Sequence, residues 1–212
     1  MKIRVWDLPT RVFHWALVVA IVGSFISADE GGNALEWHAR FGYFILSLVL
    51  CRLVWGFVGS HYARFFNFLK SPKVVLGYLK NPTELAGHNP LGALSVMALL
   101  GFLLVQAITG LFASDDIAFE GPLSKYVSSD WVELLTSFHR FDESVLVTLI
   151  MLHIGAILYY RWIKGVNLVK PMMTGDKEWV EKIPVARDDF LLRLFALVIY
   201  IAIASMLYYF LR

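Results

Sequence analysis

The stretch FHRFDESVLVTLIMLHIGAILYY, residues 138–160, decides the fold. Its larger part is an apolar run that contains His153, and His139 stands shortly before that run. A segment of about 20 apolar residues can cross a hydrocarbon core about 30 Å thick, and in lipid it must satisfy its own backbone hydrogen bonds as a helix. We therefore predict a transmembrane helix over residues 143–162, with one histidine inside it and another at its entrance.

Four other blocks have a similar length and apolar character, and they lie at residues 12–28, 39–59, 92–113 and 190–211. The chain is 58% hydrophobic and only 17% charged, which is too little charge to cover a soluble domain of this size. We predict an all-α integral membrane protein with a four-helix transmembrane bundle and a fifth, C-terminal transmembrane helix. The lysines and arginines flank the spans instead of forming one cluster, so we expect no nucleic-acid partner.

The charge of the connecting segments alternates along the chain. Lysine and arginine dominate before the first span and in loops 60–91 and 163–189, whereas the loops after the first and third spans are acidic. The acidic residues of those two loops are Asp29, Glu30, Glu36, Asp115, Asp116, Glu120, Asp130, Glu133 and Asp142. Because lysine and arginine are retained on the cytoplasmic side, we predict a cytoplasmic N-terminus and a C-terminus on the opposite side.

Four of the six histidines lie at or inside the predicted spans. The spacing of fourteen residues between His139 and His153 leaves them about 40° apart around a helix and about 21 Å apart along it. Both therefore face the interior of the bundle, one near each membrane surface. The alternating topology places His38, at the start of the second span, level with His139. It places His14, at the start of the first span, level with His153.

Two pairs of neutral imidazoles on facing helices are the ligands that six-coordinate haem iron requires. Each histidine alone also fits a buried or interfacial polar residue, but the two matched levels favour haem. A zinc site would need three or four ligands that converge on one point. The single cysteine, Cys51, excludes a CxxCH attachment motif and iron–sulfur ligation. We thus predict two non-covalent haem b groups, one between His14 and His153 and the other between His38 and His139.

Arginines near the ends of the spans are candidates for pairing with haem propionates, because a guanidinium group binds carboxylates in a bidentate manner. For each of them, snorkelling toward the membrane interface is an equal alternative. The candidates are Arg11, Arg40, Arg52 and Arg140.

Several further motifs accompany the stretch 138–160 along the chain. They are VWDLPTRVFHW (5–15), WHARFGYFILSLVLCRLVWGFVGSHYARF (37–65), GHNPLGAL (87–94) and TGLFASDD (109–116). In this order they resemble the bacterial cytochrome b561 family, which shares its fold with the membrane cytochrome b subunits of nickel–iron hydrogenases and formate dehydrogenase. The likeness covers about residues 3–175.

The resemblance implies a four-helix core with two b haems stacked across the bacterial inner membrane, ligated by His14, His38, His139 and His153. It implies respiratory electron transfer between ubiquinone or menaquinone and a redox partner. The partner would be a subunit of a hydrogenase or dehydrogenase, or a periplasmic cytochrome c, which the acidic outer loops would attract. A superoxide:ubiquinone oxidoreductase is an alternative, although those acidic loops would repel superoxide. Whether the chain is itself an enzyme stays open.

The resemblance also divides the chain. Residues 1–175 would form the dihaem transmembrane domain, and residues 176–212 would add a cytoplasmic loop and an extra transmembrane helix with a periplasmic C-terminus. His61 and His88 lie in loop motifs, and we do not assign them as ligands.

Overall fold

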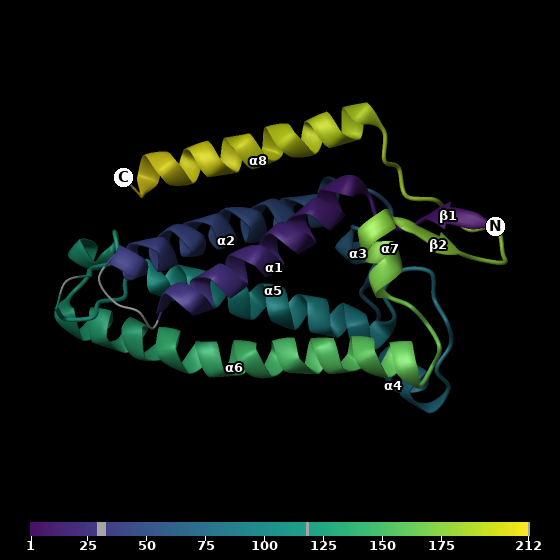
Figure 1. Cartoon of the computed structure of the whole chain (residues 1–212), viewed down its shortest axis with the longest axis horizontal. Coiled ribbons are helices and arrows are strands. Elements are labelled where there is room, and N and C mark those ends of the chain that lie inside the picture. The colour runs from purple at the N-terminus through teal and green to yellow at the C-terminus, as the bar shows by residue number, and fades with distance from the viewer. Residues whose placement is uncertain (29–32, 118, 212) are drawn as a thin grey trace. The chain divides into compact units, whose positions relative to one another are not determined.

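Five long apolar helices make up most of the chain (Figure 1). The computed structural model describes residues 1–28, 33–117 and 119–211, so the acidic residues Asp29 and Glu30 lie outside the described part. Each helix is long and apolar enough to cross a membrane, which confirms the prediction of an all-α integral membrane protein. The five helices are α1 (Leu8–Ala28), α2 (Asn33–Val58), α5 (Pro90–Gly110), α6 (Ser129–Trp162) and α8 (Phe190–Phe210).

Helix α6 begins fourteen residues before the predicted start of the fourth span, at Ser129 instead of residue 143. Its 34 residues correspond to a length of about 51 Å at 1.5 Å per residue. That exceeds the roughly 30 Å of a hydrocarbon core. Hydropathy detects only the apolar part of such a helix, whereas its hydrogen-bonded backbone continues through the polar first turns. His139 consequently lies well inside a helix.

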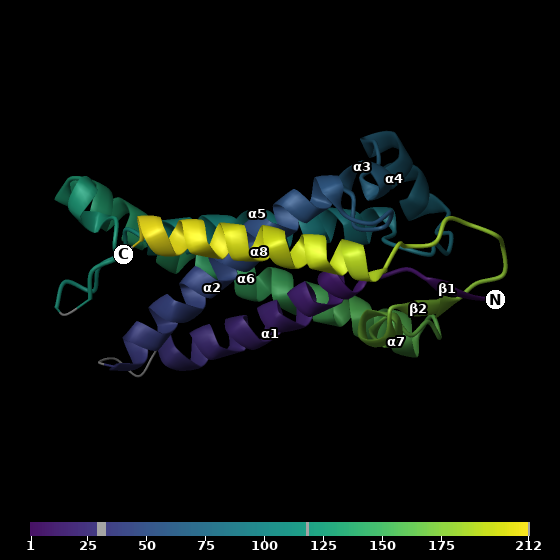
Figure 2. The ribbon, with the colours of Figure 1, turned by 90° about the horizontal axis from the view of Figure 1, so that it is seen from above.

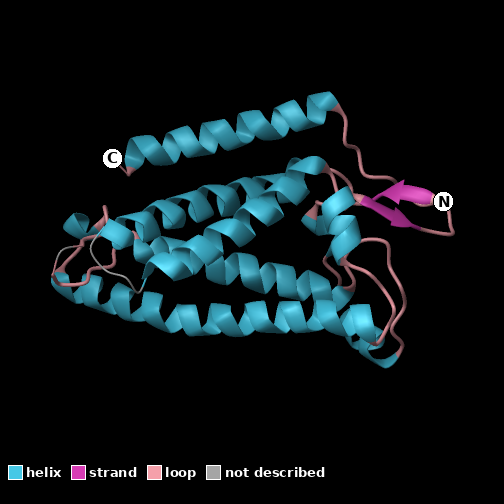
Figure 3. Cartoon of the chain, in the orientation of Figure 1, coloured by secondary structure: helices cyan, strands magenta, loops and turns pink. Residues whose placement is uncertain are grey.

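The remaining elements are short (Figure 3). They are β1 (Lys2–Arg4), α3 (Phe65–Phe68), α4 (Pro72–Lys80), a 3-10 helix at Ser124–Tyr126, α7 (Val169–Thr174) and β2 (Asp176–Glu178). Strands β1 and β2 pair antiparallel, with Lys2 opposite Glu178 and Arg4 opposite Asp176. Figure 2 shows this pairing with α7 beside it. Strands of three residues are too short to produce an alternating pattern, so the sequence did not predict them.

The chain forms two compact units. The first unit consists of residues 1–13, 52–99 and 149–197, and the second of residues 14–51, 100–148 and 198–212. One hydrophobic cluster of the first unit is built around Ile3, Val5 and Trp6, on β1 and just after it. The partly buried hydrophobic residues that pack against this cluster are Tyr62, Ala86, Met172, Trp179 and Ile183.

A carboxylate just before α8 ties the two chain ends of the first unit together. Asp188 accepts hydrogen bonds from Arg4 Nη1 at 2.8 Å and from the backbone N–H of Leu8 at 3.0 Å. It also accepts one from Arg193 Nε at 3.0 Å. Burial raises the pKa of Asp188, but the hydrogen bonds from Arg193 and Leu8 outweigh it and hold that pKa below its usual value. The N-terminal strand is therefore held by residues that follow position 175; a domain boundary there remains a prediction.

Candidate functional site

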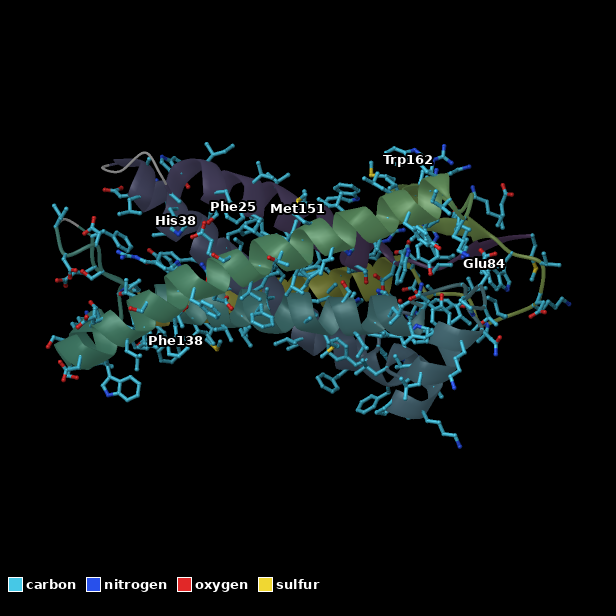
Figure 4. All side chains as sticks on the ribbon, turned by 90° about the horizontal axis from the view of Figure 1, so that it is seen from below. Phe25, His38, Glu84, Phe138, Met151 and Trp162 are labelled. Atoms are coloured by element: carbon cyan, nitrogen blue, oxygen red, sulfur yellow. The ribbon has the colours of Figure 1, made fainter. Side chains whose placement is uncertain are left out.

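The second unit brings His38 of α2 next to His139 of α6. Their ring centres are 6.2 Å apart, and the two ring planes cross at 86°. Figure 4 labels His38 among the side chains of this unit, on the helix that the sequence predicted to carry it. Two imidazoles on separate helices thus approach each other in the manner of two ligands that share one metal ion.

Hydrogen bonds determine which nitrogen of each imidazole is available. His38 Nδ1 lies 3.0 Å from the carbonyl oxygen of Ser24, and Ser24 Oγ lies 3.2 Å from the same nitrogen. His139 Nδ1 lies 2.9 Å from the carbonyl oxygen of Gln106. A carbonyl oxygen can only accept, so both Nδ1 atoms carry the proton. The lone pair of each neutral ring is then on Nε2, where it can bind a metal.

Helix α5 has no histidine, but Gln106, Thr109 and Gly110 of this helix contact the ring of His139 and form its seat. Besides the carbonyl of Gln106, Thr109 Oγ1 lies 3.3 Å from His139 Nδ1. A Cβ atom at Gly110 would lie only 2.9 Å from His139 Cε1, so the imidazole occupies the space that this glycine leaves. The sequence analysis missed Gln106 and Thr109. Their only signal was two polar residues three positions apart, followed by a glycine, at the end of an otherwise apolar helix.

The side chain of Gln106 also approaches the metal-binding nitrogen. Gln106 Nε2 lies 3.3 Å from His139 Nε2, so the amide donates into the lone pair that would face a metal. The amide oxygen of Gln106 is buried and has no hydrogen-bond partner among the described residues. Metal binding at His139 therefore requires this amide to turn away.

The two histidines line a cavity of about 410 Å³, which is within the range of ligand-binding cavities. Small residues such as Ala39, Gly42 and Gly110 form part of its wall, and they let a flat ring come close to the backbone. Two imidazoles bound to one metal ion from opposite sides are separated by two metal–nitrogen bonds and by the distance from each bonded nitrogen to its ring centre. These lengths add up to about 6 Å between the ring centres. The separation of 6.2 Å and the chemistry of the two nitrogens therefore fit one haem iron between His38 and His139.

The predicted arginines have different surroundings in the second unit. Arg140 lines the cavity. Arg40 pairs with Glu36 at 3.3 Å on the exposed face of α2, and its guanidinium lies 4.7 Å from the ring centre of Trp37. Of these two arginines, only Arg140 is among the residues that line the cavity.

The other two arginines belong to the first unit. Arg11 donates to the carbonyl of Met173 at 2.9 Å. Arg52 is buried, donates to the carbonyl of Ala63 at 3.0 Å, and lies over the ring of Phe65. The contacts of both tie segments of the first unit together. A role for either in binding haem remains a prediction.

A family model of prokaryotic cytochrome b561 matches residues 5–175. The chain belongs to this family. It is 26% identical to a probable Ni/Fe-hydrogenase B-type cytochrome subunit of Azotobacter vinelandii, over 82% of this chain and 87% of that protein. It is 22% identical to the corresponding protein of Bradyrhizobium diazoefficiens, over 84% of this chain and 86% of that protein. No solved structure matches the chain significantly.

Family membership establishes the general function of the chain. A prokaryotic cytochrome b561 is a multi-pass membrane protein that holds haem b and transfers electrons. The resemblance predicted from the sequence is therefore confirmed. The second predicted ligand pair has one member in each unit, because His14 belongs to the second unit and His153 to the first. Its pairing stays a prediction.

The first unit of this cytochrome contains a half-buried histidine that the sequence left unassigned. The ring of His88 lies between Trp6 and Phe68, with ring centres 4.7 Å and 4.5 Å away. Burial, together with the charges of Arg52 and His153, lowers the pKa of His88 to about 3. The ring is therefore neutral at physiological pH and acts as part of an aromatic cluster.

Proposed function

We propose that this cytochrome b561 holds two haem b groups and transfers electrons between the quinone pool and a hydrogenase. The observation that carries the proposal is the pair His38 and His139, with ring centres 6.2 Å apart and both Nδ1 atoms bonded to backbone carbonyls. When bound there, haem supplies a one-electron carrier. The protein would supply two neutral imidazoles in a fixed tautomer, His38 and His139, to hold the iron.

The second haem is proposed between His14 and His153. The support is that His153 lies on α6 together with His139, about 21 Å away along the helix axis. One porphyrin cannot reach both levels, so His153 needs an iron of its own. His14 on α1 is the remaining histidine of the membrane spans and supplies the second ligand.

The proposed partner follows from the relatives. Proteins of Azotobacter vinelandii and Rhodobacter capsulatus that resemble this chain are described as probable Ni/Fe-hydrogenase B-type cytochrome subunits. We therefore favour a membrane-associated hydrogenase as electron donor, with ubiquinone or menaquinone as acceptor, in the bacterial inner membrane. A periplasmic cytochrome c is a second candidate partner, since Asp115, Asp116 and Glu120 make the outer loop acidic.

Haem quantitation tests the number of haems. Purified protein should contain two haem b per chain, and acidified organic solvent should extract both. His38→Ala and His139→Ala should remove the same haem, whereas His14→Ala and His153→Ala should remove the other. His61→Ala is the matched control, because His61 lies in a loop and its ring contacts Asn67. A single haem in the unmodified chain, or two haems that survive all four substitutions, would contradict the proposal.

Reduction experiments test the partner. Hydrogen, added to membranes that contain both the hydrogenase and this cytochrome, should reduce the haems, and a quinone analogue should reoxidise them. Membranes without the cytochrome should lose hydrogen-dependent quinone reduction while the hydrogenase still reduces an artificial dye. If quinone reduction persists without the cytochrome, the hydrogenase does not pass its electrons through this chain.

A further inference from the structure

Helix α4 of the first unit is amphipathic. At 100° per residue, its apolar side chains occupy one arc of about 200°, and Lys73 and Lys80 lie about 20° apart on the opposite side. The apolar residues of the arc are Val74, Val75, Leu76, Tyr78 and Leu79. In a soluble protein an arc of this width would face the core.

The protein covers only a small part of this apolar arc. Tyr78 is buried, and its hydroxyl lies 3.0 Å from that of Tyr160 on α6. By contrast, Val74 is 48% exposed, Leu76 61% and Leu79 54%. The arc is therefore wider than the contact that attaches α4 to α6, and the rest of it needs another apolar environment.

The position of the contact on α6 identifies that environment. Tyr160 is two residues before the end of α6, a helix long and apolar enough to cross the membrane. At that end, Trp162 is 73% exposed (Figure 4), as is typical of aromatic residues at the boundary between lipid and water. Helix α4 is thus attached to a transmembrane helix at the depth of the membrane interface, and its uncovered residues continue the lipid-facing surface.

The charges of the same segment are complementary to anionic lipids. Residues 65–83 contain Lys70, Lys73 and Lys80 and no acidic residue. Lys70 donates to the carbonyl of Asn67 at 3.0 Å. Neither Lys73 nor Lys80 forms a salt bridge with any described residue of the chain. Ahead of α4, the apolar side chains of Phe66 and Leu69 are also exposed.

We propose that residues 66–80, the interfacial segment, lie in the plane of the membrane and bind anionic phospholipids. The apolar arc of α4 enters the boundary between headgroups and acyl chains, and the lysines contact lipid phosphates. This proposal rests on the chain being a membrane protein and is independent of the number of haems. The segment then fixes the connection between α2 and α5, residues 59–89, against the bilayer.

Site-directed spin labelling tests the depth of the segment. In a Cys51→Ala background, single cysteines replace Leu76 and Leu79 on the apolar arc, and Lys73 and Gly77 on the polar side. The labelled protein is reconstituted in nanodiscs of phosphatidylcholine and phosphatidylglycerol, and an unchanged haem spectrum reports folding. Labels at positions 76 and 79 should collide with oxygen and be shielded from a water-soluble nickel complex, whereas labels at positions 73 and 77 should show the reverse. Free access of nickel to positions 76 and 79, or shielding of all four labels from both reagents by a protein partner, would overturn the proposal.

Lipid selectivity tests the role of the charges. Each lysine near an anionic surface favours binding by about fivefold, so Lys73→Gln with Lys80→Gln should reduce the association of spin-labelled phosphatidylglycerol, relative to phosphatidylcholine, by up to about 25-fold at the segment. The matched control replaces Lys125 and Lys170, which lie outside the segment, with glutamine and should keep the selectivity. High salt should weaken the selectivity of the unmodified protein. Equal selectivity in the two double variants would refute the binding of anionic lipid by these lysines.

Discussion

Two glycines of α5 offer a matched pair of substitutions that tests the seat of His139. A Cβ atom at Gly110 would lie 2.9 Å from His139 Cε1 and 3.3 Å from its Nδ1, whereas a Cβ atom at Gly101 would have no atom within 4 Å. Gly101 lies inside the helix and Gly110 is its last residue, so the change to alanine should gain about 1 kcal/mol of helix propensity at residue 101 and less at residue 110. Only the substitution at residue 110 touches the proposed ligand.

The geometry sets the size of the effect. Carbon atoms in contact are about 3.5–4.0 Å apart, so Gly110→Ala must displace the imidazole by roughly 0.6–1 Å. The ring cannot move freely, because its Nδ1 donates to the carbonyl of Gln106 at 2.9 Å. Disturbing a residue that orients a metal ligand costs about 10–100-fold in affinity. We expect haem binding to weaken by that factor in Gly110→Ala and to stay unchanged in Gly101→Ala.

Titration of haem into the haem-free protein measures this difference directly. The readout is the absorption band of the bound haem after reduction. The two variants should unfold at similar or slightly higher temperatures than the unmodified chain when no haem is present. Under those conditions, a weaker affinity in Gly110→Ala reports on His139 and not on folding. If Gly110→Ala binds haem as tightly as Gly101→Ala does, His139 is not held by α5 in the way described, or it does not bind iron.

Three further changes probe other parts of the molecule. Gly42 lines the cavity, and a Cβ atom there would meet nothing within 4 Å; Gly42→Leu should therefore lower haem content while the haem-free protein keeps its thermal stability. His88 has a pKa of about 3 in the folded chain instead of 6.5. Between these two pH values, only the unfolded chain therefore binds a proton at the imidazole of His88. The free energy of unfolding should therefore fall by about 1.4 kcal/mol per pH unit as the pH drops below 6.5. His88→Gln should make the melting temperature less dependent on pH in a thermal-shift assay. Asp188→Asn should destabilise the first unit by about 2 kcal/mol, because it weakens three hydrogen bonds to a charged acceptor. Limited proteolysis should then cut near the N-terminus, while haem at His38 and His139 stays bound.

The sequence predicted the spans and the proximity of His38 and His139 for physical reasons. Long apolar runs have few alternatives to a transmembrane helix, because lipid offers no partner for backbone polar groups. A histidine inside such a run is costly and faces the interior of the bundle, and the alternation of charge along the chain determines which histidines share a level. Helix periodicity and topology were sufficient to select His38 and His139 as neighbours.

Neither the start of α6 nor the contact of the N-terminal strand with Asp188 follows from hydropathy, periodicity or charge. Residues 129–142 contain six apolar and eight polar or charged residues, so their hydropathy is lower than that of the apolar run that follows. Backbone hydrogen bonding does not depend on the side chain being apolar, and the helix includes them. Contacts such as Arg4 with Asp188 join residues 184 positions apart. A charge pattern does not specify such a long-range pair, because any of several arginines could have reached the same carboxylate.

The contacts of α5 with His139 are the part of the candidate site that the sequence did not predict. Helix α5 carries no ionisable residue, so it contains neither a charge nor a metal ligand that would mark it as part of a site. Its contribution is a backbone carbonyl at Gln106 and the missing side chain of Gly110, and neither is a property of a residue type that implies haem. Both act only because α6 presents His139 to that part of α5. Candidate ligands of a membrane haem can therefore be proposed from their own chemistry, whereas the groups that orient them become identifiable only once the helices are packed.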